Sequence, residues 1–183
     1  MRKLLQNLVA APVIETERLI LRGLQASDFD AFHEMHTDPQ VYHFLTGKPL
    51  SKEDAWARML RLTGLWNLVG HGYWALENKP TSQLAGFAQF HRELATAMPE
   101  PEAGWALASA WHGQGYATEA MQVITDWGDQ LIDAPQTACM IEPENLTSQK
   151  LAQKLGYVLA VETNYKDNPV QLFHRQRVIK PLL

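Results

Sequence analysis

The stretch Ser109-Ala-Trp-His-Gly-Gln-Gly-Tyr-Ala-Thr-Glu-Ala120 places two glycines, Gly113 and Gly115, directly before a segment with helical periodicity. The apolar positions of that segment share one helical face: Ala117, Ala120, Met121, Ile124, Gly128 and Leu131. Thr125 and Asp129 fall mostly on other faces. The pattern therefore predicts a helix whose first turn comes directly after the glycines.

The residues of this stretch leave two interpretations open, a phosphate-binding loop and a plain turn from strand to helix. The stretch lacks the Gly-Lys-Ser/Thr ending of a Walker loop, and Thr118 replaces the third glycine of the dinucleotide fingerprint. The start of a helix nevertheless exposes backbone N–H groups that can bind an anion. No Ser, Thr, Asp or Asn between positions 111 and 117 could cap those groups, and glycines without Cβ atoms let a pyrophosphate approach the main chain.

The segments around the glycines have the patterns of strands. Apolar and β-branched runs bounded by turn residues predict strands at 16–22, 72–77, 84–91, 102–109, 136–141, 157–163 and 170–178. The second and third of these form a hairpin, and Lys166-Asp-Asn-Pro169 is the expected turn between the last two. The strand at 102–109 leads directly into the glycines.

Helical patterns occupy the intervals between strands. The first, at 29–37, begins at Ser27-Asp28 and ends at Asp38-Pro39. A second begins after Ser51, and the last runs over 146–155 and ends at Gly156. The second helix carries apolar residues at helical spacing: Ala55, Met59, Leu62 and Trp66. Residues 37–50 and 95–101 are expected as loops, and the mixture of hairpins and helical crossovers predicts a mixed α/β sheet flanked by helices.

Composition excludes several function classes. The 183 residues carry 16 Lys and Arg against 20 Asp and Glu, without a basic run, so we expect no nucleic-acid partner. Gln6 and Asn7 interrupt the apolar N-terminal run, so we expect no membrane span, and residues 1–13 are interpreted as a lead-in to one domain at 14–183. The single cysteine, Cys139, and scattered histidines favour a cytoplasmic protein without a metal site.

Four motifs in order give the chain a resemblance to a known family. The stretch Trp111-His-Gly-Gln-Gly-Tyr-Ala-Thr-Glu-Ala120 resembles the acetyl-CoA loop of the GNAT superfamily of N-acetyltransferases, and in particular the branch resembling ribosomal-protein N-terminal (alanine/serine) acetyltransferases. Thr16-Glu-Arg-Leu-Ile-Leu-Arg22 is similar to that branch's opening strand and Glu102-Ala-Gly-Trp-Ala-Leu107 to its fourth. The segment from Glu144-Asn-Leu-Thr-Ser148 to Lys154-Leu-Gly-Tyr157 is similar to its final helix and turn, so the resemblance covers about residues 14–178.

The resemblance implies a fold and a coenzyme site. The fold would be α/β (α+β), a GNAT-like, mostly antiparallel sheet of about seven strands flanked by about four helices, with a V-shaped gap between strands four and five. The pyrophosphate of acetyl-CoA would bind the loop amides, and its pantetheine arm would pair with strand four as an added strand does. The residues implied in coenzyme binding are Trp105, Ala106, Leu107, His112, Gly113, Gln114, Gly115, Tyr116, Ala117, Thr118, Asn145 and Ser148. His112 departs from the usual Gln or Arg, and Asn145 has an alternative role as a helix N-cap.

The same resemblance implies direct attack of an amine on the thioester, with the amide of Leu107 stabilising the oxyanion. Glu102 matches a strand-four glutamate that acts as general base in relatives; its alternative is an exposed strand-edge carboxylate, and His91 is a second candidate base. Glu119 is expected on the outer side of its helix. Cys139 has no role in such a reaction and is expected as a buried strand residue.

The proton donor to the departing thiolate is less well defined by the resemblance. The position seven residues after Asn145, where many relatives carry a tyrosine, is Ala152, and Ser148 is the remaining polar group near sulfur. The leading hypothesis is therefore an N-acetyltransferase acting on a primary amine, either a protein N-terminus or a small molecule. A catalytically idle acyl-CoA-binding or sensor domain is the alternative that Ala152 motivates. Acetyl-CoA and the amine acceptor are the expected partners, and a monomer and a homodimer both remain open.

Overall fold

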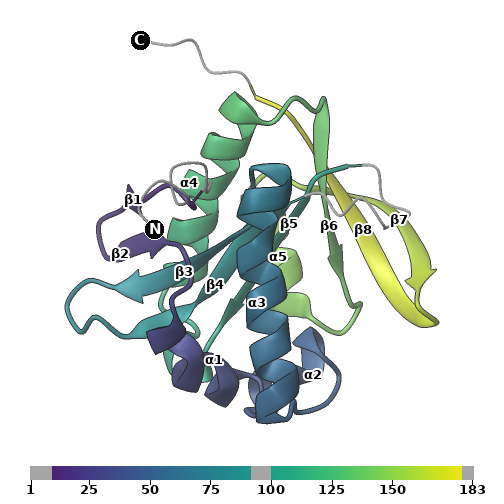
Figure 1. The fold of residues 1–183 in the computed structure, drawn as a ribbon. Coiled ribbons are helices and arrows are strands. Elements are labelled where there is room, and N and C mark those ends of the chain that lie inside the picture. Colours follow the sequence, from purple (N-terminus) through teal and green to yellow (C-terminus); the bar gives the residue numbers. More distant parts are fainter. Residues whose placement is uncertain (1–9, 92–99, 179–183) are drawn as a thin grey trace.

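The computed structural model of the chain describes residues 10–91 and 100–178. Its strands are β1 Ile14–Glu15, β2 Leu19–Arg22, β3 Tyr73–Asn78, β4 Leu84–His91, β5 Glu102–Leu107, β6 Gln136–Ile141, β7 Val158–Tyr165 and β8 Asn168–Gln176. They form one 8-stranded sheet in the order β1-β2-β3-β4-β5-β6-β8-β7 (Figure 1). Neighbouring strands are antiparallel except β5 and β6, which are parallel. The predicted mixed, mostly antiparallel sheet is confirmed.

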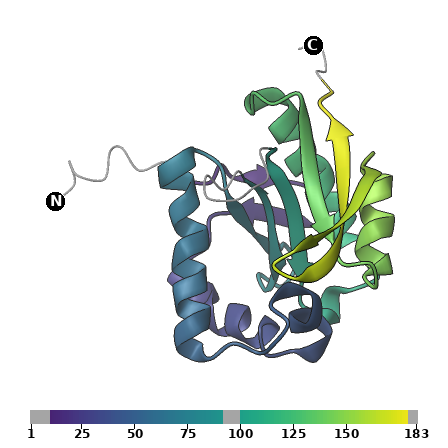
Figure 2. The same ribbon diagram turned by 90° about the vertical axis from the view of Figure 1, so that its right-hand side faces the viewer.

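Helices cover both faces of this sheet. They are α1 Phe29–Met35, α2 Pro39–Leu45, α3 Lys52–Val69, α4 Tyr116–Leu131 and α5 Leu146–Lys154. Helices α1 and α3 lie on one face, and α4 and α5 lie on the other (Figure 2). The helical spacing that predicted α3 is confirmed, since its buried residues are Ala55, Met59, Leu62 and Trp66, and the Oγ atom of Ser51 accepts from the amide of Asp54 at 3.1 Å. Each face of the sheet thus has its own apolar core.

The region between β2 and α3 differs from the prediction. The sequence indicated two helices before the hairpin and a loop over 37–50, whereas the structure contains α2 within that loop. Asp38 caps α2 by accepting a hydrogen bond from the amide of Gln40 at 2.9 Å, and Pro39 takes the first helical position. Proline is favoured at that position because its missing N–H is not needed there. The same Asp-Pro pair that was interpreted as a helix end therefore starts a helix.

Smaller differences affect the strand ends. The strand expected at 16–22 begins only at Leu19, as β2, because the amide of Thr16 donates to the carbonyl of Leu19 in a turn; β1 lies before this turn, at Ile14–Glu15. The Asp28 carboxylate accepts from the amide of Gln25 at 2.8 Å and pairs with Arg22, so it does not cap α1 by its side chain. In the last hairpin the turn consists of Lys166 and Asp167, both with positive φ, and Asn168 and Pro169 already belong to β8.

The buried face of α4 also differs in part from the apolar pattern. Leu131 is 66% exposed, while Thr125 and Asp129 are buried. The hydroxyl of Thr125 donates to the carbonyl of Met121 at 2.8 Å, and Asp129 forms a buried ion pair with Arg175 of β8. Satisfied polar groups of this kind can occupy a core position that hydrophobic periodicity assigns to apolar residues.

None of the helices within 10–91 and 100–178 is long and apolar enough to cross a membrane. No group of three or more His, Cys, Asp or Glu side chains in those ranges is arranged to hold a metal ion. Most of the loop expected at 95–101, and residues 1–9 of the expected lead-in, lie outside the described residues.

Candidate active site

The site lies where β5 and β6 separate. Among the described residues the two strands pair at Glu102 and Ala138, next to which the amide of Ala138 donates to the carbonyl of Pro101 at 3.0 Å. Beyond that point β6 and β8 turn away from β3, β4 and β5 (Figure 1). The V-shaped gap expected between the family's fourth and fifth strands is therefore present between β5 and β6.

The backbone of β5 presents hydrogen-bonding groups to this gap. Residues of an antiparallel strand alternate between those bonded to the partner and those whose N–H and C=O point away. The amide of Ala108 donates to Ala85 on the β4 side at 3.0 Å, so the backbone groups of Trp105 and Leu107 point toward β6. The Leu107 carbonyl accepts from Nε2 of His112 at 2.9 Å. One edge of β5 is thus available to an extended ligand.

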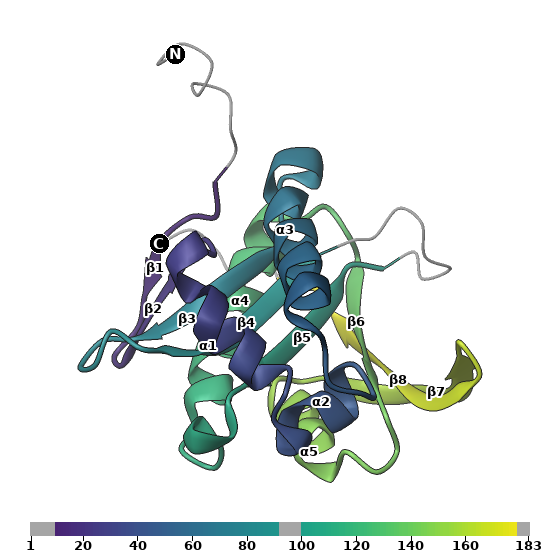
Figure 3. The same cartoon turned by 60° about the horizontal axis from the view of Figure 1, so that its bottom comes forward.

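A cavity of about 460 Å³ occupies the open end of the gap. Helices α2 and α5 flank it together with β5 and the glycine loop (Figure 3). The residues expected to bind the coenzyme that line it are Trp105, Ala106, Leu107, His112, Gly113, Gly115, Tyr116, Ala117, Thr118, Asn145 and Ser148. Gln114 is not among the lining residues, because its side chain turns back and donates to the carbonyl of Ala110 at 2.8 Å.

The glycine loop has the backbone conformation that its sequence requires. Gly113 and Gly115 have φ values of 72° and 83°, in the left-handed region that side chains disfavour. Gly115 is the N-cap of α4, and no side chain in the part of the chain that the structure describes hydrogen-bonds this cap. The first-turn amides of α4 therefore remain available at the wall of the cavity, as predicted from the missing capping residue.

The opposite wall is formed by the start of α5. Asn145 caps that helix, since its Oδ1 atom accepts from the amide of Ser148 at 3.1 Å, which confirms the N-cap interpretation. Nε1 of Trp105 donates to Oγ of Ser148 at 3.3 Å. This contact joins β5 to α5 across the gap and places the Ser148 hydroxyl inside the cavity.

Glu102 and Glu119 both lie elsewhere than in the cavity wall. Glu102 lies at the closed end of the gap, in one row across the sheet with His91 of β4, Ala138 of β6 and His174 of β8. Nε2 of His174 is buried and has no hydrogen-bond partner among the described residues. His174 was not predicted from the sequence, because only strand register brings it into the row with Glu102.

The prediction for Glu119 is wrong, because its carboxylate faces the β1–β2 turn instead of the outer side of α4. The carboxylate accepts from Oγ1 of Thr16 at 2.6 Å, from the amide of Arg18 at 2.8 Å and from Nε of Arg18 at 2.7 Å. Burial alone would raise the pKa of Glu119, but these hydrogen bonds outweigh burial and the pKa is lowered. Glu119 thus stays ionised and ties α4 to the start of β2.

Cys139 is buried in β6, as expected. Burial raises the pKa of its thiol, so the thiolate, which is the reactive form, is disfavoured. The side chain packs in the apolar core under α4 and α5 and takes no part in the cavity.

Several lining residues were not predicted. Gln40, Val41, Phe44 and Leu45 come from α2, the helix that the sequence analysis missed. Lys150 and Lys154 of α5 also line the cavity. Lys150 and Lys154 each follow a lining residue, Thr147 and Leu151, by three positions and are four positions apart. All four residues therefore share one helical face, a signal that was available in the sequence.

Comparisons with known proteins agree with this geometry. The family model described as an acetyltransferase (GNAT) domain matches residues 18–158. An uncharacterized N-acetyltransferase p20 from Bacillus licheniformis is 27% identical over 143 residues, which cover 78% of this chain and 80% of that protein. The family match includes β2 through α5 and therefore every wall of the cavity.

Solved structures share the whole fold. An acetyltransferase from Agrobacterium tumefaciens strain C58 superposes with a TM-score of 0.81 at 26% identity, covering 91% of this chain and 95% of the other. The ribosomal L7/L12 α-N-protein acetyltransferase RimL, solved with coenzyme A, has the same fold with a TM-score of 0.74 at 16% identity, covering 90% and 98% of the two chains. From the domain match and the fold together, the chain belongs to the GNAT family and is an N-acetyltransferase.

Proposed function

We propose that the protein transfers the acetyl group of acetyl-CoA to a primary amine, with a protein N-terminal amine as the acceptor. The observation that carries the proposal is the continuity of the cavity. It joins the edge of β5 that faces the gap, at Trp105 and Leu107, to the start of α4 at Gly115, where no described side chain caps the helix. An extended amide-containing arm that ends in a phosphate group fits that combination.

In this proposal the coenzyme follows the cavity from the loop into the gap. The amides from Gly113 to Thr118 hold the pyrophosphate, since the amide of His112 already donates to the carbonyl of Ser109 at 3.0 Å. Lys150 and Lys154 supply positive charge to the same cavity from α5. The pantetheine arm pairs with the β5 backbone around Trp105 and Leu107. RimL, which has the same fold, was solved in complex with coenzyme A, and this supports coenzyme A as the ligand.

The reaction forms one C–N bond and breaks the C–S bond of the thioester. The neutral amine attacks the carbonyl carbon, and the amide of Leu107, which faces the gap, donates to the oxyanion. Glu102 accepts the amine proton through water from the closed end of the gap. Ser148 holds the thiolate or a water that protonates it, and coenzyme A leaves as the thiol.

The position of Glu102 also indicates how the acceptor approaches. The coenzyme would fill the open end of the gap, and Glu102 lies at the closed end beside Ala138. The amine would therefore arrive at the closed end of the gap between β5 and β6, away from the glycine loop. A peptide N-terminus can thread into such a position as an extended chain, which supports a protein acceptor.

An assay of coenzyme A release tests the proposal. Purified protein is incubated with acetyl-CoA and peptides that begin with alanine, serine or methionine, with the same peptides blocked at the N-terminal amine, and with small primary amines. We expect thiol release above hydrolysis with the free peptides and none with the blocked ones. Turnover with small amines alone would show that the acceptor is a small molecule and not a protein N-terminus. Tight coenzyme binding without turnover on any amine would support the sensor alternative that Ala152 motivates.

A further inference from the structure

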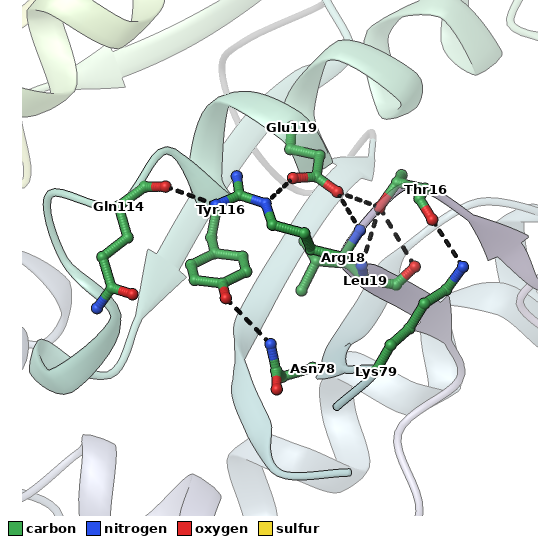
Figure 4. A network of polar contacts seen from close by, with 8 residues as sticks. All are labelled: Thr16, Arg18, Leu19, Asn78, Lys79, Gln114, Tyr116 and Glu119. Carbon is green, nitrogen blue, oxygen red and sulfur yellow. Dashed lines mark hydrogen bonds and ion pairs between the residues drawn. The ribbon is translucent and has the colours of Figure 1, made fainter. Parts of the chain in front are cut away.

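The turn between β1 and β2 lies against the glycine loop, although it is far from it in sequence. Figure 4 shows Arg18 of this turn extended over the first turn of α4. Nη1 of Arg18 donates to the carbonyl of Gln114 at 2.9 Å, and its Nε donates to the Glu119 carboxylate at 2.7 Å. Arg18 itself is not a lining residue of the cavity in the described chain. It therefore contacts the outer side of the loop whose inner side faces the cavity.

The same arginine also contacts the residue that follows the loop. The guanidinium carbon of Arg18 lies 4.2 Å from the ring centre of Tyr116. That ring is held on two other sides, by a hydrogen bond from Asn78 to its hydroxyl at 3.1 Å and by an edge-on contact with Trp111 at 5.3 Å. The fixed ring gives the guanidinium a rigid surface on which to lie.

Gly115 lies between Arg18 and the cavity. A Cβ atom placed on Gly115 would come within 3.4 Å of Nη2 of Arg18. The guanidinium thus fills the space behind this glycine. Together with the bond to the Gln114 carbonyl, this contact limits how far the loop can move outward, away from the cavity.

Charge gives Arg18 a second effect. Glu119 lies in the first turn of α4, where a carboxylate would repel an anion bound at the same helix end. Arg18 pairs with that carboxylate in two hydrogen bonds, one from its amide and one from its side chain, and Thr16 adds a third. The pair is neutral as a whole, so the helix end keeps its attraction for an anion.

We propose that Arg18 is a positioning residue for the coenzyme loop: it holds the Gln114 carbonyl outward, so that the loop amides face the cavity, and it cancels the charge of Glu119 beside the pyrophosphate. Arg18 acts from behind the loop and touches neither the coenzyme nor the reacting atoms. The inference rests on the proposed function, because it assumes that the loop binds coenzyme A.

Isothermal titration of coenzyme A into the full-length chain tests the inference without an acceptor. The variants are Arg18→Met, Arg18→Lys and the double variant Arg18→Met/Glu119→Gln. Lys79→Met is the matched control, because Lys79 pairs with Glu15 and donates to the carbonyl of Thr16 at 2.7 Å but does not contact the loop. A misfolded fraction lowers the binding stoichiometry, whereas a displaced loop raises Kd at full stoichiometry.

We expect Arg18→Met to raise Kd about tenfold or more, as the loss of a charge-assisted pair and a loop contact does. Arg18→Lys should fall between wild type and Arg18→Met, Lys79→Met should bind as wild type, and the double variant should bind more tightly than Arg18→Met. Arg18→Lys provides the test if Arg18→Met does not fold.

Three results would count against the account in different ways. Wild-type affinity in a folded Arg18→Met or Arg18→Lys variant overturns the positioning role, as does an equal loss in Lys79→Met. If the double variant binds coenzyme A no more tightly than Arg18→Met does, cancelling the charge of Glu119 is not part of the role of Arg18. Absence of binding by the wild-type chain contradicts the proposed function itself, and so is distinguished from failure of the inference.

Discussion

His36 is a fully buried ionisable residue packed between aromatic rings. Its ring lies between Phe32 and Phe87, with centroid distances of 4.3 and 5.8 Å. Nδ1 donates to the carbonyl of Phe32 at 2.7 Å, and Nε2 is buried without a partner among the described residues. A proton on Nε2 would place an unpaired N–H in an apolar core. Burial accordingly lowers the pKa of His36 to about 4, with smaller contributions from Arg58 and His33.

This pKa makes stability depend on pH in a defined window. Between about pH 4 and 6.5 the unfolded chain binds a proton at His36 that the folded chain does not, so stability falls on acidification through that window, by about 3 kcal/mol from this group. Urea unfolding of wild type and His36→Leu at pH 7, 5.5 and 4.5 measures the effect. We expect a shallower pH dependence in the variant, and identical slopes would contradict this assignment.

Glu102 is the residue on which the proposed base catalysis depends. Glu102→Gln keeps the size and hydrogen-bonding ability of the side chain but removes the group that accepts a proton. Turnover should fall at least about tenfold with little change in coenzyme affinity, and the acidic limb of the pH–rate profile should disappear. Steady-state kinetics across pH with an active amine checks this. An unaltered profile would exclude Glu102 as the general base and would leave His91 and His174, which lie in the same row across the sheet, as the candidates.

Features of single residues that depend on their neighbours in the chain could be predicted from the sequence, whereas contacts between residues far apart in the chain could not. The missing cap before α4 and the N-cap role of Asn145 follow from neighbours within a few residues, so the sequence indicated both. Glu119 was misplaced because its main partner, Arg18, is 101 residues away in the chain. No periodicity within α4 contains that information.

Helix α2 has only seven residues but contributes several side chains to the wall of the cavity. It lies over β5 and lines the cavity with Val41 and Phe44. Asp38 anchors its start in two ways, by capping the amide of Gln40 and by a hydrogen bond with Ser109, which is the larger cause of the lowered pKa of Asp38. The helix is thereby tied to the segment that leads from β5 into the glycine loop.

A pair of capping variants separates this anchoring from simple helix stability. Asp38→Ala and Ser51→Ala each remove an N-cap and should each lower the free energy of unfolding by about 1 kcal/mol. Only Asp38→Ala should weaken coenzyme A binding, because α3, which Ser51 caps, does not line the cavity within the described chain. Denaturant unfolding and calorimetry measure the two quantities. Equal effects of both variants on affinity would contradict the role assigned to α2.

A long helix with a regular apolar spacing could be predicted from the sequence, whereas a short helix could not. Helix α3 has 18 residues and a regular apolar spacing, and it was predicted with its buried residues. Helix α2 has only seven residues, too few for a clear helical pattern, and it begins at an Asp-Pro pair. Local rules allow such a pair either to end a helix or to start one. Only packing against β5 decides between them.

On the scale of the whole molecule, one buried ion pair connects the helical layer to the far half of the sheet. Arg175 of β8 donates from Nη1 and Nη2 to the two oxygens of Asp129 in α4, each at 2.7 Å. Its Nε donates to the carbonyl of Leu155, at the end of α5, at 3.0 Å. The three contacts join α4, α5 and β8 beneath the side of the sheet that diverges from β5.

Breaking this pair should be costly because it leaves a buried charge. Asp129→Ala is expected to destabilise the fold by about 3–5 kcal/mol. The matched control is Asp133→Ala, since Asp133 is fully exposed and pairs with Arg177 at 3.4 Å, an arrangement that contributes little. Thermal and urea unfolding compare the two. Similar small losses in both variants would show that Asp129 and Arg175 do not hold the two halves together.

The global arrangement was predictable only in outline. Hairpins and helical crossovers have local sequence patterns, so the mixed sheet flanked by helices could be predicted from those patterns. The gap between β5 and β6 has no such pattern, because it depends on where two strands stop pairing that meet at Glu102 and Ala138, 36 residues apart in sequence. The gap was expected from the family resemblance alone.

Calorimetric titration of acetyl-CoA into wild type, Gly115→Ala and Gly115→Asp tests whether the glycine loop binds the coenzyme. At φ 83° both substitutions strain the backbone, and the added Cβ comes within 3.4 Å of Nη2 of Arg18 behind the loop. Aspartate at this N-cap position also brings a carboxylate that can occupy the first-turn amides of α4, which the pyrophosphate would otherwise bind. The account predicts saturable 1:1 binding to wild type, about tenfold or greater weakening in Gly115→Ala, and no detectable binding to folded Gly115→Asp. Wild-type affinity in a folded Gly115→Asp variant would contradict it.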